Sequence, residues 1–483
     1  MTPTIGPDVP IAHILSNRGR STTPRRPTVP RIRAPSSGAS IDYSTSRSLP
    51  RSSSSPILSN NGDEAVVRVD GLRHAHFSLE ARRYKSHAFA AQLLDIICAL
   101  HIPVWRVKEL SPSNLAIEKV SGSMTNAVFF VSCPSIPTIP VLLLRIYGPS
   151  SGSLISRPRE LQTLHILSSR YRIGPQVYGT FENGRIEEYF HSSALTAQDL
   201  RDPKTSAWIG ARMAELHQVD IAAVEDIPSS VVGVKVKEDH GWFVGAKRNV
   251  LSWLPEARDV LALPSVSDSI RRDLDLSTFE TQWNDYMHWI DEKEKKEGPS
   301  QRVFAHNDTQ YGNLLRLTSP KVGTPEHRQV HHFLAIQSII VVDFEYASPN
   351  PAAFDIANHF HEWTANYHST NPHVLNPDLY PSLTQRRNFY QAYLSHLETP
   401  IQTTITSSST PQKNKESVEL DLQRLDDQVK AWSPASHAMW AIWGIVQARE
   451  ALEGKDGELE FDYVAYALGR MNHFRRELRA LLP

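Results

Sequence analysis

Two stretches of this chain carry the most information: HNDTQYGN at residues 306–313 and DFEYASPNPAAFDIANHFHEW at residues 343–363. Asp308 stands five positions before Asn313, and Asp343 follows 30 residues after Asn313, at the end of an apolar run. Phosphoryl transfer needs a carboxylate that takes the proton of the acceptor hydroxyl, and oxygen ligands that hold Mg²⁺ on nucleotide phosphates. The pattern H-x-D-x(4)-N, an apolar strand and then D-F is typical of a kinase catalytic core. The sequence therefore predicts a kinase.

Each of these residues also has a purely structural explanation. An isolated H-x-D-x(4)-N is best explained by an aspartate that caps a turn, and Asn313 or Asp343 could be a turn residue. The combination favours Asp308 as the general base and Asn313 and Asp343 as Mg²⁺ ligands. Asp355 begins a helical run, where an N-terminal cap is the default explanation. By analogy with kinase-like folds, we expect Asp355 to brace the catalytic loop.

The composition excludes several classes of function. Lys and Arg number 51 against 52 Asp and Glu, so nothing indicates nucleic acid as a main partner. Two cysteines cannot form a disulfide framework and suggest a reducing compartment. No apolar run approaches the roughly 20 residues that cross a bilayer, and the N-terminus lacks an apolar secretory core. We therefore expect a cytoplasmic protein without a transmembrane segment.

The predicted fold class is α+β, with a small antiparallel-sheet N-lobe over residues 63–190 and a large, mainly helical C-lobe over residues 191–483. Residues 1–62 are rich in Ser, Pro and Arg, with too few large apolar side chains to order, and predict a disordered basic tail. Nine prolines among the first 60 residues argue against a transit-peptide helix. The Ser/Thr-rich stretch 399–415 predicts a low-complexity surface insert.

Periodicity predicts the individual elements. In the N-lobe we expect a helix over 87–100, two extended segments around the turn 121–126, a buried strand over 141–147, a helix over 160–169, and strands over 176–181 and 186–190. In the C-lobe the clearest helices are 204–219, 278–295 and 435–452.

Arg145 lies on the apolar strand VLLLRIY and would need a partner if it points inward. Glu160, on the next helix, is the natural partner, as in the strand-lysine and helix-glutamate pair of protein kinases. A surface arginine on an edge strand is the alternative. The turn SGSMTN at residues 121–126 is a weak phosphate-loop signal, and taken alone it predicts a hairpin turn.

Trp440 and Trp443 stand three apart on a predicted helix and share a face. Such a stripe usually belongs to a core, although aromatic walls with nearby carboxylates also bind quaternary ammonium groups. Spacing alone favours core packing. A box for such a cation would be completed by the aromatic residues Tyr346, Tyr367 and Tyr466, and Glu345, Glu362 or Glu460 would add negative charge.

Six pieces of the sequence resemble the choline/ethanolamine kinase family, in family order and with compatible spacing. They are VSGSMTNA (120–127), VLLLRIYG (141–148), IGPQVYGTFENGRIEEYF (173–190), LTAQDLRDP (195–203), and the segments 304–315 and 342–363. The resemblance runs from about residue 80 to 475 and implies a two-lobed protein-kinase-like fold.

The resemblance also implies roles for matching residues. Asp308 would be the base, Gln310 would align the reacting groups, and Asn313 and Asp343 would hold Mg²⁺. Adenine would lie against the backbone of residues 187–190. The implied ATP-binding residues are Ser121, Gly122, Ser123, Met124, Thr125, Asn126, Ala127, Arg145, Glu160, Glu188 and Phe190. The implied substrate-binding residues are Glu345, Tyr346, Glu362, Tyr367, Trp440, Trp443 and Tyr466.

The implied activity is ATP- and Mg²⁺-dependent phosphorylation of choline to phosphocholine, the first step of phosphatidylcholine synthesis by the CDP-choline route. The alternatives are an ethanolamine-preferring kinase and a catalytically weak, kinase-like binding scaffold. The predicted preference for choline over ethanolamine is based on Gln310-Tyr311-Gly312 and on the tryptophans. Family members are commonly dimers, so a homodimer is a further expectation.

Overall fold

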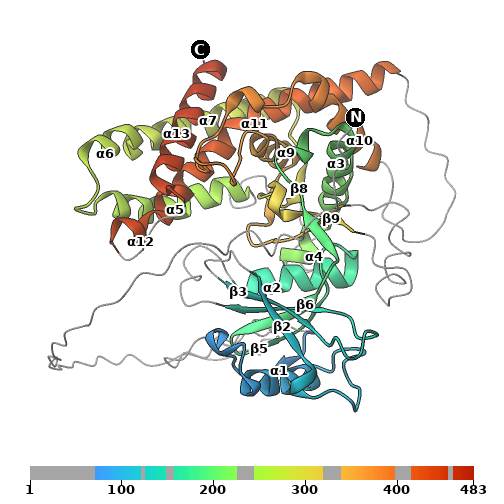
Figure 1. Cartoon of the computed structure of the whole chain (residues 1–483). Coiled ribbons are helices and arrows are strands. Elements are labelled where there is room, and N and C mark those ends of the chain that lie inside the picture. Colours follow the sequence, from blue (N-terminus) through green and yellow to red (C-terminus); the bar gives the residue numbers. More distant parts are fainter. Residues whose placement is uncertain are drawn as a thin grey trace, which may run out of the picture.

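The computed structural model describes residues 71–120, 126–147, 157–225, 244–318, 339–397, 415–454 and 461–482. They form a smaller lobe built on a sheet and a larger lobe of helices (Figure 1). The predicted tail at residues 1–62, the predicted loop residues 121–125, the side chain of Asn126 and residues 399–414 of the predicted insert lie outside the described residues.

The small lobe contains a six-stranded sheet in the order β1-β5-β6-β4-β3-β2. Neighbouring strands are antiparallel, except that β1 runs parallel to β5. The strands are β1 (His74–Ala75), β2 (Ala116–Val120), β3 (Asn126–Ser132), β4 (Leu142–Tyr147), β5 (Val177–Phe181) and β6 (Gly184–Glu188).

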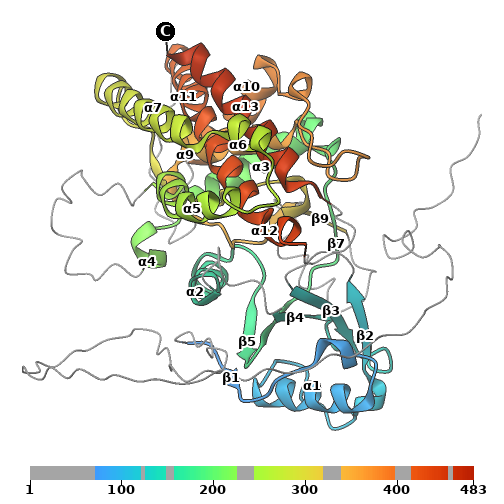
Figure 2. The same ribbon diagram turned by 90° about the vertical axis from the view of Figure 1, so that its left-hand side faces the viewer.

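Two helices cover opposite faces of this sheet. Helix α1 (His87–Ala99) lies on the face away from the large lobe, and α2 (Arg157–Ile166) lies on the face toward it (Figures 1 and 2). Leu142, Leu144 and Ile146 of β4 are buried in a core shared with α1. Because side chains alternate along a strand, Arg145 points to the opposite face, toward the large lobe.

The chain enters the large lobe directly after β6. Strand β7 (Ser192–Ala194) pairs with β9 (Leu314–Leu317), which pairs with β10 (Ile339–Val341). A second small pair joins β8 (Arg302–Ala305) to β11 (Ser348–Pro351). The segment 306–313 runs from β8 to β9 and the segment 342–347 runs from β10 to β11, so both connect the three-stranded sheet to the two-stranded one.

The rest of the large lobe is helical. Its helices are α3 (Pro203–His217), α4 (Ile221–Glu225), α5 (Gly245–Leu261), α6 (Asp268–Leu274), α7 (Leu276–Glu297), α9 (Ala352–Glu362), α10 (Leu383–Leu397), α11 (Lys415–Gln447), α12 (Arg449–Leu452) and α13 (Tyr463–Leu481). Every residue of α9 is buried, and α11 packs against α9, α5 and α13. Among the described residues, no helix has both the length and the apolar character needed to cross a bilayer.

The predicted elements agree closely with the observed ones for α1, α3, α7 and the strands β4, β5 and β6. The predicted start of the tryptophan-bearing helix at residue 435 is wrong. Helix α11 begins at Lys415 and continues through Pro434. A proline usually marks the first turn of a helix, so Pro434 suggested a boundary that the fold does not have.

Candidate active site

The backbone before Asp308 is held by Asp355 of α9. The N–H groups of His306 and Asn307 donate to the two carboxylate oxygens of Asp355 over 2.9 and 2.8 Å, and His217 Nε2 lies 3.0 Å from Oδ2. Burial would raise the pKa of Asp355, but the hydrogen bond and charge of His217, together with His306, bring it below its ordinary value. Asp355 therefore braces the loop as an anion, as expected from the sequence.

The side chain of Asn313 lies against Asp308. Asn313 Nδ2 donates to Asp308 Oδ2 and to the backbone oxygen of Asp308, both over 2.9 Å. Gln310 Nε2 donates to Asn313 Oδ1 over 3.3 Å, while Gln310 Oε1 accepts the N–H of Gly312. These hydrogen bonds therefore hold the carboxylate of Asp308 in place and orient the side-chain amide of Asn313.

Asp343 reaches the same place through strand pairing. Strand β9 starts directly after Asn313, β10 ends two residues before Asp343, and Val342 N–H donates to the oxygen of Asn313 over 3.0 Å. His306 fastens the two segments, because its Nδ1 accepts the N–H of Asp308 and its Nε2 lies 3.0 Å from the oxygen of Val342. Residues 30 positions apart in sequence thus become neighbours.

The chemistry of these donors suits a hard divalent cation. Asp343 Oδ1 is shielded from solvent, and the part of the chain that the structure describes offers it no hydrogen-bond partner. An anionic oxygen without a partner is costly, and Mg²⁺ satisfies such oxygens together with neutral amide oxygens. Asn313 and Asp343 therefore fit the pair of metal ligands that the sequence predicts.

Asp308 lies in a strongly anionic environment. Burial raises its pKa well above the ordinary value, and the negative charges of Glu362, Asp343 and Glu345 raise it further. The hydrogen bond from Asn313 acts in the opposite direction. A carboxylate with a raised pKa accepts protons more readily, as a general base requires.

Asp308 also lines a cavity of about 300 Å³ in the large lobe. All seven predicted substrate-binding residues line it: Glu345, Tyr346, Glu362, Tyr367, Trp440, Trp443 and Tyr466. Gln310 also lines this cavity. The two tryptophans, for which spacing alone favoured core packing, therefore face a space shared with the catalytic loop.

The aromatic wall of this cavity is held by hydrogen bonds. Trp443 Nε1 donates to Tyr346 Oη over 2.8 Å, and Trp440 Nε1 donates to Asn358 Oδ1 over 2.7 Å. The rings of Trp440 and Trp443 meet edge to face with centroids 5.2 Å apart. Gly444 allows α11 and α13 to approach, because a Cβ there would meet Tyr466 Cδ1 at 3.1 Å.

Sequence reasoning missed four residues of this region. Phe461 and Tyr463 line the cavity, Arg470 lies beneath it, and Asn358 joins Trp440 to the loop. Tyr463 and Arg470 stand three before and four after Tyr466, so helical spacing on α13 could have indicated both. No comparable pattern in the sequence indicates Asn358 or Phe461.

A second cavity, of about 550 Å³, lies where the two lobes meet. The segment after β6 lines it with Glu188, Phe190 and His191, and β9 and β10 contribute Leu317 and Ile340.

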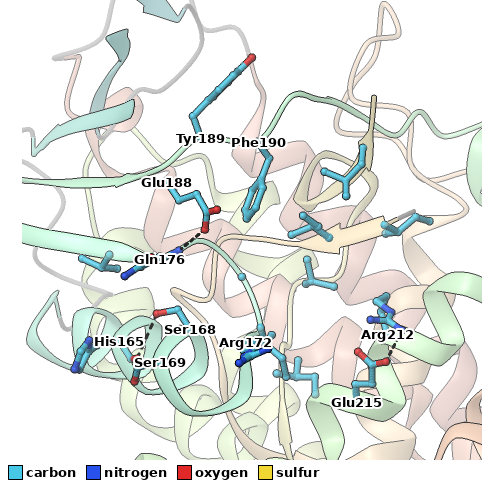
Figure 3. Close-up of a pocket in the computed structure, with 18 of the residues that line it drawn as sticks. His165, Ser168, Ser169, Arg172, Gln176, Glu188, Tyr189, Phe190, Arg212 and Glu215 are labelled. Carbon is cyan, nitrogen blue, oxygen red and sulfur yellow. Dashed lines mark hydrogen bonds and ion pairs between the residues drawn. The ribbon is translucent and has the colours of Figure 1, made fainter. Parts of the chain in front are cut away.

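Figure 3 shows Glu188 turned toward Gln176, whose N–H donates to Glu188 Oε2 over 3.2 Å, while Tyr189 points away from both. The predicted nucleotide contacts Glu188 and Phe190 thus border an open space between the lobes.

The predicted ion pair between Arg145 and Glu160 is wrong, because Glu160 pairs with a different arginine. Glu160 Oε1 lies 2.8 Å from Nη1 of Arg185, the β6 residue directly opposite Arg145 in the sheet. Arg185 also pairs with Glu187, and the two carboxylates keep its pKa above the ordinary value although burial opposes this. Arg145 Nε is shielded and has no hydrogen-bond partner among the described residues. Sequence could not tell which of two facing arginines takes the glutamate.

The two lobes, the braced loop and the three converging oxygen-bearing side chains define a phosphotransferase of the kinase-like type. The sequence profile of the choline/ethanolamine kinase family matches residues 117–475. The chain therefore belongs to the choline/ethanolamine kinase family, and it is a kinase.

The chain is similar to proteins of known sequence and structure. The choline kinase of Schizosaccharomyces pombe is 33% identical over 81% of this chain and 90% of its own length. The human choline/ethanolamine kinase is 29% identical over 77% of this chain and 81% of its own length. A crystal structure of choline kinase from Cryptosporidium parvum covers 81% of this chain and 95% of its own chain, with a TM-score of 0.58 at 22% identity. This likeness confirms the predicted kinase-like fold.

Proposed function

We propose that the chain transfers the γ-phosphoryl group of ATP to the hydroxyl of choline, giving phosphocholine and ADP. This is the first step of phosphatidylcholine synthesis by the CDP-choline route. The observation that best supports the proposal is the 300 Å³ cavity that Asp308 lines together with Trp440 and Trp443. That cavity offers a base to an alcohol and aromatic faces to a cation within one small space.

Candidate residues for binding Mg²⁺ and the nucleotide phosphates lie on both lobes. Asn313 and Asp343 would hold Mg²⁺, which when bound offsets negative charge on the transferred group. Arg145 Nε, a shielded donor without a partner among the described residues, would donate to phosphate oxygens. The adenine would occupy the 550 Å³ cavity beside the backbone of residues 187–190.

The transfer itself needs one base and one acceptor. Asp308 takes the proton of the choline hydroxyl as the hydroxyl oxygen bonds to the γ-phosphorus. The bond from the γ-phosphorus to the bridging oxygen breaks, and its electron pair leaves with ADP. Asn313 keeps the Asp308 carboxylate in place through the 2.9 Å hydrogen bond. The raised pKa of Asp308 suits it to accept this proton.

The trimethylammonium head would lie against the aromatic wall. Such a cation has no N–H group, and it is attracted to the electron-rich faces of aromatic rings. Tyr346, Trp440, Trp443 and Tyr466 supply these rings, and Glu362 adds negative charge nearby. Alcohol and head would thus lie at opposite ends of the same cavity.

An ethanolamine-preferring kinase is the second candidate, since Glu345 and Glu362 also line the cavity and carboxylates accept N–H donors. A catalytically weak scaffold is a poor alternative because Asp308, Asn313 and Asp343 are all present and adjacent. The deciding experiment incubates the purified chain with ATP and Mg²⁺ and with each amine separately, and measures phosphorylated product. A higher kcat/KM for choline supports the proposal. A higher value for ethanolamine, or no turnover of either amine, refutes it.

A further inference from the structure

A fully buried arginine lies directly beneath the amine cavity. Arg470 of α13 is 0% exposed and has partners on three helices. Its Nη2 donates to Glu362 Oε1 over 2.9 Å and its Nε donates to Tyr466 Oη over 3.0 Å, while Nη1 lies 3.4 Å from His437 Nδ1. A fixed positive charge beside a pocket proposed for another cation needs an explanation, because like charges repel strongly away from water.

The partners of Arg470 keep it charged and immobile. Burial would lower the pKa of Arg470, but Tyr466 and Glu362 hold it above its ordinary value. Burial and the nearby charge of Arg470 hold the pKa of His437 well below its ordinary value, so this ring is neutral and accepts at Nδ1. Nε2 of the same ring then faces Glu477 Oε1 at 3.5 Å. Arg470 is therefore a permanent cation fixed from α9, α11 and α13.

The fixed charge of Arg470 mainly affects Glu362. Its Oε1 accepts from Arg470, and its Oε2 accepts the hydroxyl of Tyr367 over 2.7 Å. Both oxygens of this buried carboxylate are thus engaged before any substrate enters, and its charge is offset by the guanidinium. Glu362 can still contribute a diffuse negative field, but about half of its four acceptor sites are already used and its two oxygens are held in place by their partners.

The two candidate amines respond differently to such a carboxylate. A primary ammonium carries three N–H donors, and it loses hydration at high cost unless acceptors replace water. A quaternary ammonium carries none and needs only aromatic faces and a diffuse field. The indole N–H groups of Trp440 and Trp443 are donors bound to Asn358 and Tyr346, so the tryptophans offer a primary ammonium no acceptor, and Glu345 is the other glutamate that lines the cavity.

We propose that Arg470 is a positioning residue that sets the preference for a quaternary over a primary ammonium head, by engaging Glu362 and fixing Tyr466. This inference rests on the proposed function of the cavity as the amine site. It goes beyond that function by naming what selects between the two amines. Without Arg470, Glu362 loses the cation that offsets its charge and the donor to Oε1, while Tyr367 still occupies Oε2, and this favours ethanolamine.

The test is the ratio of kcat/KM for choline to kcat/KM for ethanolamine in Arg470→Gln. We expect the ratio to fall about tenfold, mainly through a higher KM for choline and a lower KM for ethanolamine, as one freed charge-assisted hydrogen bond predicts. Arg470→Lys, which keeps the cation, should restore much of the ratio. Equal losses for both amines in Arg470→Gln, with the ratio unchanged, would mean a structural role only and overturn the inference.

Two further variants keep the result clear if Arg470→Gln does not fold. Tyr367→Phe removes only the donor to Glu362 Oε2, and it should shift the ratio in the same direction by a smaller factor. An unchanged ratio in Tyr367→Phe would then overturn the inference. The matched control is Arg185→Gln, which removes an equally buried guanidinium with two carboxylate partners from the other lobe and should leave the amine ratio unchanged. Turnover of either amine by the wild-type chain tests the proposed function separately from the ratio.

Discussion

Trp440 donates its indole N–H to Asn358 Oδ1 over 2.7 Å. Asn358 Nδ2 in turn donates to the backbone oxygen of Asn307 over 2.9 Å, one residue before Asp308. A single buried asparagine therefore joins the aromatic wall to the catalytic loop. Trp443 donates instead to Tyr346 Oη. The backbone oxygen of Tyr346 accepts Asn307 Nδ2 over 2.8 Å, and this contact does not depend on the Trp443 N–H.

This difference predicts distinct effects of two matched substitutions. Trp440→Phe keeps a ring in the wall but loses one of the two donors to Asn358 Oδ1, the other being Ser436, so it should lower kcat by about tenfold and raise the KM for choline. Trp443→Phe should raise the KM for choline and leave kcat near the wild-type value. Steady-state kinetics with choline would distinguish them. Identical kinetic profiles for the two variants would show that the wall and the loop are independent.

The bracing of the loop by Asp355 can be tested by substituting this residue. Asp355→Asn replaces an acceptor of the His306 and Asn307 N–H groups by an amide that cannot accept both with its two atoms. We expect a loss of roughly 3 kcal/mol in the free energy of unfolding and a kcat lower by about 100-fold.

The matched control for the brace is Asp426→Asn, because Asp426 is also buried and accepts from Arg386 and Tyr390, away from the loop. It should lose stability without a comparable loss of kcat. A normal kcat in folded Asp355→Asn would refute the brace. Urea denaturation and steady-state assays measure both quantities.

We expect that replacing Asp308 by a neutral residue raises the stability of the chain and abolishes its activity. Its pKa in the folded chain lies above that in the unfolded chain, so the folded chain holds this proton more tightly. The stability that Asp308 contributes is present at acid pH and is lost as the pH rises through the folded-state pKa. Asp308→Asn, which cannot ionise, should therefore be inactive yet melt a few degrees higher at neutral pH in metal-free buffer. The gain should shrink as the pH is lowered, and a gain of the same size at every pH would contradict the prediction.

Asp343 should control the metal requirement. Asp343→Ala removes the anionic oxygen that has no partner among the described residues, so half-maximal activity should need more than about tenfold more Mg²⁺. Glu345→Gln removes one negative charge two residues away, and it should leave the metal requirement unchanged while raising the KM for choline. Titrating activity with Mg²⁺ at saturating ATP measures the shift. Equal metal requirements for the two variants would remove Asp343 from the metal site.

The convergence of Asp308, Asn313 and Asp343 was predictable because these residue types at this spacing are rare in combination. Asp308, Asn313 and Asp343 have a spacing that few other functions need. The seven predicted substrate-binding residues came from the resemblance to a family, since spacing alone assigned Trp440 and Trp443 to a core.

The errors arose where packing decides between equal candidates. Arg145 and Arg185 lie opposite each other on adjacent strands, and only the position of α2 determines which of them meets Glu160. Pro434 is tolerated inside α11, although proline favours a helix start. Asn358 is one asparagine among many in the sequence, and its role appears only when α9, α11 and the loop are together.

The most direct measurement follows the reaction by ³¹P NMR with purified protein, ATP, MgCl₂ and choline, for the wild-type chain and for Asp308→Ala. We predict that the wild-type chain forms phosphocholine and ADP in equal amounts, only when Mg²⁺ is present. Asp308→Ala, checked by its melting curve to be folded, should lose activity by orders of magnitude. Phosphocholine formation by folded Asp308→Ala at the wild-type rate would contradict the assignment of Asp308 as the base.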